Sequence, residues 1–186
     1  MTIGFAMTGS FCTYSEVFPV LELLARDYSM IPIFSNAAVS IDSRFGAARE
    51  HIQQAAEICG CSPLTTISQV EPIGPRKLLD ALIIAPCTGN TLAKLSHGIA
   101  DTAVTMAAKS HLRNGRPVIL AISTNDGLAA AAENIGRLLA RKHYYFVPFG
   151  QDDPKNKANS LIADFSKIPQ TLDAALEGRQ VQPVLL

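Results

Sequence analysis

Short apolar runs along the chain predict β-strands. The clearest is Ala81–Ala85, in which five apolar residues follow one another without polar alternation. Such a run is typical of a parallel strand that is covered on both faces, and Pro86 is expected to end it. By the same pattern, strands are predicted at Thr2–Met7, Tyr28–Phe34, Ala81–Ala85, Pro117–Ile122 and Tyr144–Val147.

Segments with helical periodicity lie between these strands. In the first of them, Val17, Leu21 and Leu24 fall on one stripe at helical spacing. The region between residues 62 and 75 is ambiguous, with Thr65–Ile67 read as a short strand, and Gln151–Asn159 is predicted to be a surface loop. Helices are predicted at Glu16–Asp27, Ser43–Gly60, from the turn after Pro86 to Leu95, Ile99–Arg113, Leu128–Lys142 and, broken near Pro169, within Ser160–Glu177.

This alternation of strands and helices predicts an α/β fold. The expected architecture is three-layered α/β/α, with a doubly wound parallel sheet of the flavodoxin-like or Rossmann-like type. A length of 186 residues is that of one ordinary domain. We therefore expect residues 1–186 to form a single α/β domain with a loose C-terminal tail from about residue 178.

Composition narrows the classes of partner. Hydrophobic residues make up 48% of the chain, and 16 basic residues balance 16 acidic ones. There is no basic excess for binding nucleic acid or an anionic membrane. Since neither a bilayer-spanning apolar run nor a signal peptide is recognised, a cytoplasmic location is expected. The four cysteines lack the paired spacing of a structural zinc site, and no metal site is predicted.

The segments that follow the predicted strands are rich in hydroxyl, amide and glycine groups. They are Thr8–Ser10, Ser35–Asn36, Pro86–Thr91 and Ser123–Asn125. In open parallel sheets, ligands bind beyond the carboxyl ends of the strands. The unpaired N–H groups at the start of a helix, here near Thr88, favour an anion. The alternative is that these residues only cap helices, but four such exits in one sheet favour an anionic small-molecule site.

Two common nucleotide motifs are missing. The first loop contains only Gly9 and lacks the G-x-G-x-x-G pattern of a dinucleotide site, and no Gly-Lys-Ser/Thr of a P-loop occurs. Phosphate held by hydroxyls and helix N-termini, without an obligatory lysine, fits a mononucleotide such as FMN.

Three motifs carry a resemblance to a known family. Met7–Ser10, Ala85–Leu95 and Gly98–Asp101 resemble, in order and spacing, the flavoprotein family of FMN-dependent cysteine decarboxylases and their relatives. The similarity covers about the first 150 residues and implies a flavodoxin-like fold that binds FMN. Carried to matching positions, it implies an FMN site made of Gly9, Ser10, Ser35, Pro86, Thr88, Asn90 and Thr91, to which the exit after the next strand adds Ser123 and Asn125.

The sequence departs from the decarboxylases of this family. Their catalytic histidine precedes the central strand, where this chain has Glu71–Pro75 and no histidine. Of their Pro-x-Met-Asn substrate motif only Asn125 is present. His97, His111 and His143 lie on predicted helices or at a helix end and are interpreted as structural or exposed. The catalytic residues therefore remain unassigned.

A closer resemblance within the family is to one subunit of a two-subunit oxidoreductase. It is carried by Thr8–Tyr14, Phe34–Asn36, Glu71–Gly74 and Ala121–Leu128. It implies a partner chain that brings the NAD(P) site, a small dicarboxylate substrate and a homo-oligomeric assembly. An FMN-binding decarboxylase-like protein and a non-catalytic scaffold subunit are the alternatives. Near the predicted strand exits, Arg44, Arg76 and Lys77 are candidates to hold carboxylates, or are solvated surface charges.

Overall fold

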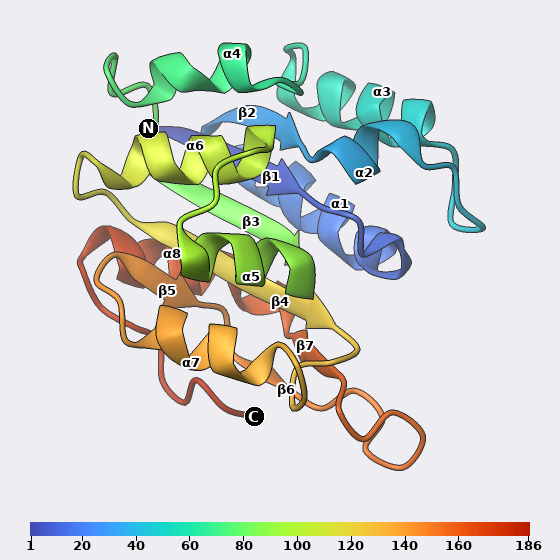
Figure 1. Cartoon of the computed structure of the whole chain (residues 1–186). Coiled ribbons are helices and arrows are strands. Elements are labelled where there is room, and N and C mark those ends of the chain that lie inside the picture. The colour runs from blue at the N-terminus through green and yellow to red at the C-terminus, as the bar shows by residue number, and fades with distance from the viewer.

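The computed structural model describes all of residues 1–186 and contains seven strands and eight α-helices (Figure 1). The strands are β1 (Thr2–Met7), β2 (Ser29–Phe34), β3 (Ala81–Cys87), β4 (Val118–Thr124), β5 (Tyr144–Phe146), β6 (Phe149–Gly150) and β7 (Leu161–Ala163). The helices are α1 (Tyr14–Leu24), α2 (Asn36–Ser40), α3 (Ala48–Cys59), α4 (Ile67–Val70), α5 (Gly89–His97), α6 (Ala103–Leu112), α7 (Ala132–Leu139) and α8 (Ile168–Leu176).

The centre of the molecule is a parallel sheet. Strands β2, β1, β3, β4 and β5 are all parallel and follow one another in that order. This is the flavodoxin-like strand order, so the predicted α/β fold class is confirmed. A short antiparallel extension, β7 with β6, joins the carboxyl end of β4 at Ser123 and Thr124.

Helices cover both faces of this sheet. In Figure 1, α5, α6 and α7 lie in front of the sheet, while α1 and α8 lie behind it. Every residue of β3 is buried, as expected for the middle strand of a sheet with two covered faces. One hydrophobic cluster of 47 buried residues runs through both interfaces. No helix is long and apolar enough to cross a membrane.

Several element boundaries differ from the sequence prediction. Pro86 does not end β3, which continues to Cys87 with an irregular register against β4. Thr65–Ile67 is not a strand, because Thr66 caps α4, its side chain accepting a hydrogen bond from Gln69 N. Pro169 does not break a helix but stands in the first turn of α8, where a missing N–H does no harm.

The remaining helices are shorter than their periodicity predicted. A turn at Ser43–Gly46 delays α3 to Ala48, and the preceding short helix α2 was not predicted. Thr102 caps α6, so this helix begins at Ala103 and not at Ile99. Strand β7 occupies the start of the segment that was expected to be helical from Ser160.

The C-terminal segment is anchored and not loose. The Gln180 side chain pairs with both main-chain groups of Phe146, and the N–H of Phe149 donates to the Val184 carbonyl. Val181 is buried. These contacts extend the folded structure beyond residue 178, where the sequence had predicted a loose tail.

Candidate functional site

The polar strand exits meet in one cleft because parallel strands present their carboxyl ends at the same edge of a sheet. The cleft has two adjoining cavities, which we call the Ser35 lobe and the Ser123 lobe, of about 450 and 460 Å³. The Ser35 lobe is lined by Thr8, Gly9, Ser35, Asn36, Ala37, Thr88, Asn90, Thr91, Lys94, Asp101 and Thr102. The Ser123 lobe is lined by Gly9, Ser10, Cys12, Thr13, Thr88, Gly89, Asn90, Ser123, Thr124, Asn125, Asp126, Asp152, Lys157, Ser160, Leu161 and Ile162.

Eight of the nine residues predicted to bind a cofactor line this cleft. Gly9, Thr88 and Asn90 line both lobes, and so join them. Ser35 and Thr91 line the Ser35 lobe, whereas Ser10, Ser123 and Asn125 line the Ser123 lobe. The ninth, Pro86, lines neither lobe and is buried within β3. Its place in the site is indirect, because its carbonyl accepts a hydrogen bond from the first loop.

That hydrogen bond belongs to a network around Thr8. The buried Thr8 hydroxyl donates to the Pro86 carbonyl at 2.6 Å and accepts from the Thr88 N–H at 3.2 Å. The Tyr14 hydroxyl donates to the Thr8 carbonyl at 2.9 Å. The exits of β1 and β3 are thus held together by one side chain, and burial raises the pKa of Tyr14, which keeps its hydroxyl a donor.

The N-terminus of α5 forms the wall between the lobes. Thr88 caps this helix, its side chain accepting a hydrogen bond from Thr91 N at 3.3 Å. A Cβ at Gly89 would lie 2.7 Å from Thr124 Oγ1 and 2.8 Å from Asp126 Oδ1. Glycine therefore lets the β4 exit approach the helix N-terminus closely. The first N–H groups of α5 have no acceptor within the helix, which favours an anion here.

A second link closes the cleft on the side of β4. The hydroxyl oxygens of Ser10 and Ser123 lie 2.6 Å apart and share a hydrogen bond. Ser10 follows β1, and Ser123 lies near the carboxyl end of β4. These two strands are the neighbours of β3 in the sheet. The bond therefore bridges the two strands on either side of the central one.

Two lysines in the cleft were not predicted as site residues. Lys94 lines the Ser35 lobe, and its ammonium lies 2.8 Å from Asp101, whose pKa this hydrogen bond lowers. Lys157 lines the Ser123 lobe and pairs with Asp152 at 3.0 Å. Hydrogen bonds from Ser160 and Lys157 lower the pKa of Asp152, and the pKa of Lys157 is raised in return. Lys94 lies within the recognised motif, but nothing in the sequence around Lys157 indicates that its loop reaches β4.

The basic residues named from the sequence lie elsewhere. Arg44, Arg76 and Lys77 line neither lobe. Arg76 and Lys77 precede β3 and so lie toward its amino end, opposite the strand exits. Arg44 stands in an exposed turn, with its guanidinium over the Phe45 ring. Arg76 and Lys77 are therefore not near the strand exits, and none of the three residues lines the cleft.

No histidine lines either lobe. His111 is buried and contacts the Pro117 carbonyl through Nε2. His97 is exposed, and His143 lies between α7 and β5. The nucleophilic side chain present is Cys12, which is exposed at the Ser123 lobe, whereas Cys87 is buried and its pKa is raised by that burial. No cluster of three or more potential metal ligands is found.

A hydroxyl-lined cleft at the carboxyl edge of a 2-1-3-4-5 sheet is the arrangement of flavodoxin-like ligand-binding proteins. Residues 1–168 match the Flavoprotein family, and this chain belongs to it. It is 43% identical, over 99% of its own length and 92% of the relative's, to the B subunit of dipicolinate synthase from Bacillus subtilis (strain 168). The closer resemblance seen in the sequence is therefore confirmed.

Solved structures agree with this placement. The B subunit of dipicolinate synthase from Bacillus halodurans C superposes with a TM-score of 0.91 at 43% identity, covering 100% of this chain and 95% of that one. The FMN-dependent cysteine decarboxylase SpaF superposes with a TM-score of 0.69 at 21% identity, covering 94% and 97%. At that identity the second match shows a shared fold and no more.

Proposed function

We propose that this chain is the B subunit of a dipicolinate synthase, which acts with an A subunit to oxidise dihydrodipicolinate to dipicolinate during spore formation. The observation that carries the proposal is the 43% identity to the B subunit of a dipicolinate synthase over 99% of this chain. The cleft supports it, since its polar lining lies at the sheet edge where small anionic ligands bind.

The overall reaction removes two hydrogens from a dihydropyridine ring. One leaves as a hydride, which NAD(P)⁺ accepts to form NAD(P)H, and the other leaves as a proton. This chain has neither the G-x-G-x-x-G motif of a dinucleotide site nor the Gly-Lys-Ser/Thr of a P-loop. We therefore assign the NAD(P) site to the A subunit and the anion-binding cleft to this one.

The residues of the cleft fit FMN as a bound cofactor. The α5 N-terminus and the hydroxyls of Thr88 and Thr91 offer donors for a phosphate. Ser35 and Asn90 would hold the ribityl chain along the Ser35 lobe. When bound, FMN supplies hydride or electron transfer. The same donors also suit a phosphate group on another ligand.

The two lysines of the cleft are the groups we assign to the substrate carboxylates. Lys157 lies at the Ser123 lobe and Lys94 at the Ser35 lobe, each with a carboxylate partner. Each pair is partly exposed, so an incoming carboxylate can exchange with Asp152 or Asp101 at small cost. Ser10, Ser123 and Asn125 add neutral hydrogen-bonding groups beside Lys157.

A decarboxylase function receives less support. The cleft contains no imidazole to move a proton at the reacting carbon. We also infer a homo-oligomer in the cytoplasm of the mother cell of a sporulating bacterium. Exposed apolar side chains such as Phe45 and Leu128, which are 44% and 52% exposed, support contacts between copies.

The test is reconstitution from the two separately purified chains. Dihydrodipicolinate and NADP⁺ (or NAD⁺) are supplied to the A subunit, to this chain and to the mixture, and formation of the reduced nicotinamide is followed. Only the mixture of the two subunits is expected to be active, and neither subunit by itself. An A subunit whose activity this chain leaves unchanged would overturn the proposal, and CO₂ release from a cysteinyl peptide would favour the decarboxylase. If this chain restored activity even when its cleft residues were substituted, it would be acting as a non-catalytic scaffold.

Cofactor binding is tested on the same preparations. Thr88→Val removes a hydroxyl from the cleft, and we expect it to weaken FMN binding roughly 10-fold or more, the effect of losing a charge-assisted hydrogen bond. Thr66→Val is the matched control, because Thr66 also caps a helix but lies outside both lobes. FMN fluorescence quenching measures the affinity. Equal weakening in both variants would contradict the assignment.

A further inference from the structure

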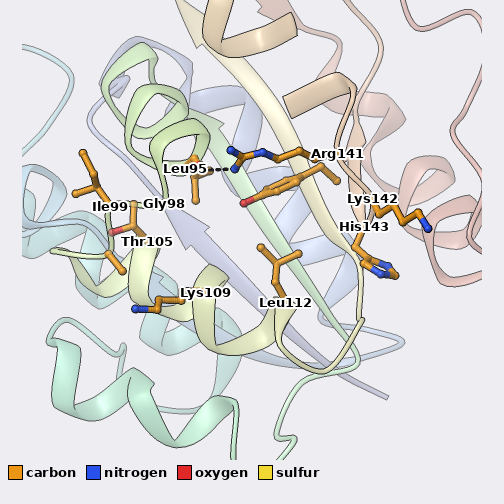
Figure 2. Close-up of a pocket in the computed structure, with 11 residues that line it drawn as sticks. Leu95, Gly98, Ile99, Thr105, Lys109, Leu112, Arg141, Lys142 and His143 are labelled. Atoms are coloured by element: carbon orange, nitrogen blue, oxygen red, sulfur yellow. Dashed lines mark hydrogen bonds between the residues drawn. The ribbon is translucent and has the colours of Figure 1, made fainter. Parts of the chain in front are cut away.

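A second cavity lies away from the cleft, between α5, α6 and the start of β5. Its volume is about 510 Å³, and it shares no lining residue with either lobe. Its floor includes Leu95 and Leu112, and Tyr144 begins β5, next to the amino end of β4. Figure 2 shows Arg141 and Leu112 on two sides of this space, with Lys109 at its edge and its ammonium directed away from Arg141, from where the flexible side chain can turn inward. The cavity thus lies toward the opposite end of the strands from the cleft.

The charged side chains of this cavity all have the same sign. They are Lys109, Arg141 and Lys142, and no carboxylate lines the cavity. None of the three takes part in an ion pair with an acidic side chain. The chain as a whole is neutral, with 16 basic and 16 acidic residues. A local excess of positive charge in a neutral protein attracts an anion.

Arg141 is held in place at the wall of this cavity. Its guanidinium donates to the Leu95 carbonyl at 3.1 Å (Figure 2) and to the Ser96 carbonyl at 2.6 Å, near the C-terminus of α5. An arginine has five N–H donors in a rigid plane, so these two bonds fix the group and leave other donors for a ligand. A positively charged group that is already ordered loses little entropy when it binds an anion.

Tyr144 adds a donor of a different kind. Its hydroxyl makes no hydrogen bond within the protein, although its side chain lines the cavity. Burial raises its pKa to about 12, so the hydroxyl keeps its proton at neutral pH. The ring offers a flat apolar surface beside Leu95 and Leu112. Flat apolar surfaces bind planar rings, and a cavity of this size accommodates a small organic molecule.

We propose that this cavity is a second ligand site, which binds a small planar ring carboxylate through Arg141, Lys109 and the Tyr144 hydroxyl. The apolar floor disfavours free phosphate, which has no apolar body to bury. The proposal does not depend on the function assigned to the cleft, since the two sites share no residue.

The experiment is calorimetric titration of the full chain with isophthalate, a planar ring dicarboxylate that does not carry the metal-chelating nitrogen of a pyridine. Isophthalamide is the neutral control of the same shape. We expect isophthalate to bind and the amide not to. Lys109→Gln and Tyr144→Phe are each expected to weaken binding about 10-fold, as for the loss of one bond to a charged group. Arg141→Lys tests the planar donor and is interpreted only if its melting temperature is retained.

Two further variants separate this cavity from a general effect of surface charge and from the cleft. Lys155→Gln removes an exposed positive charge far along the chain, in the loop before β7, and is expected to leave affinity unchanged. Because the cleft is itself assigned to a dicarboxylate, Lys157→Gln is used to identify isophthalate bound there, and it is expected to remove only binding that Lys109→Gln and Tyr144→Phe leave intact. Binding lost equally in Lys155→Gln, or binding lost in Lys157→Gln but fully kept in Lys109→Gln, would overturn the proposal. The proposal would also fail if isophthalate did not bind. It would fail likewise if Lys109→Gln and Tyr144→Phe changed the sedimentation coefficient of the protein but not its affinity for isophthalate.

Discussion

The hydroxyls of Ser10 and Ser123 lie 2.6 Å apart, although 113 positions separate the two residues in the chain. Ser10 follows β1 and Ser123 belongs to β4, so their hydrogen bond passes across the end of β3. It links two walls of the Ser123 lobe. Both hydroxyls also line that lobe, where each retains a lone pair for a ligand.

This bond can be measured with a double-mutant cycle. Ser10→Ala, Ser123→Ala and the double variant are compared by urea denaturation. We expect a coupling free energy of about 0.5–1.5 kcal/mol, the usual net value of a hydrogen bond between neutral groups. Ser40→Ala paired with Ser123→Ala serves as the control, because the exposed Ser40 hydroxyl bonds only within α2, to the Asn36 carbonyl. Additive effects of Ser10→Ala and Ser123→Ala would show that the bond contributes nothing.

Gly89→Ala tests the close approach at the α5 N-terminus. The added Cβ would meet Thr124 Oγ1 at 2.7 Å and Asp126 Oδ1 at 2.8 Å, so the β4 exit must move away. We expect FMN affinity to fall about 10-fold or more, with a modest loss of stability, since both contacts are side-chain atoms. Fluorescence titration and thermal denaturation measure the two effects.

Gly136→Ala is the matched control for that substitution. Gly136 lies inside α7, and a Cβ there meets nothing within 4 Å. Because glycine is a poor helix former, we expect this change to stabilise the protein by about 0.5–1 kcal/mol and to leave FMN affinity unaltered. A weaker FMN complex in Gly136→Ala would argue that the effect of Gly89→Ala is not specific to the cleft.

Gln180→Ala tests the attachment of the C-terminal segment. The Gln180 amide accepts from Phe146 N and donates to Phe146 O, each at 2.7 Å. Its removal leaves two main-chain groups of β5 unpaired, which we expect to cost about 1–3 kcal/mol of unfolding free energy. Gln182→Ala is the control, because Gln182 is exposed and pairs only with Val184 N. Equal stability of the two variants in urea would indicate a segment that is dispensable.

His111 predicts how stability depends on pH. Burial lowers the pKa of this imidazole from 6.5 to about 4, against the raising effect of its hydrogen bond to the Pro117 carbonyl. In the unfolded chain it titrates near its ordinary value, so between about pH 6.5 and 4 the unfolded state binds a proton that the folded state does not. This group's contribution to stability is therefore full above about pH 6.5 and falls by up to about 3 kcal/mol as the pH approaches 4.

Urea denaturation at about pH 7 and about pH 4.5 measures this effect. The loss between the two pH values is expected to be smaller in His111→Gln than in the wild type. His97→Gln, which changes an exposed histidine, is expected to retain the wild-type loss. If His111→Gln lost as much stability on acidification as the wild type, the imidazole would not be the group responsible.

Local sequence patterns were enough to predict the strands of the core and the sheet edge at which the polar cleft lies. Runs such as Ala81–Ala85 are local signals, because a strand buried on both faces needs apolar residues at every position. The exits that follow are equally local, and eight of the nine residues named from them line the cleft. The motifs Met7–Ser10, Ala85–Leu95 and Gly98–Asp101 together indicated the family.

Which distant residues meet could be learned only from the folded chain. Lys157 reaches the cleft because β7 pairs with the end of β4, and a two-residue antiparallel contact leaves no pattern in the sequence. Pro86 was expected to end a strand, yet the pairing of Cys87 with Ile122 of β4 carries β3 past it. Gln180 likewise folds the tail back onto β5. Each of these outcomes depends on contacts between distant segments, whose energies exceed the local preferences that sequence patterns report.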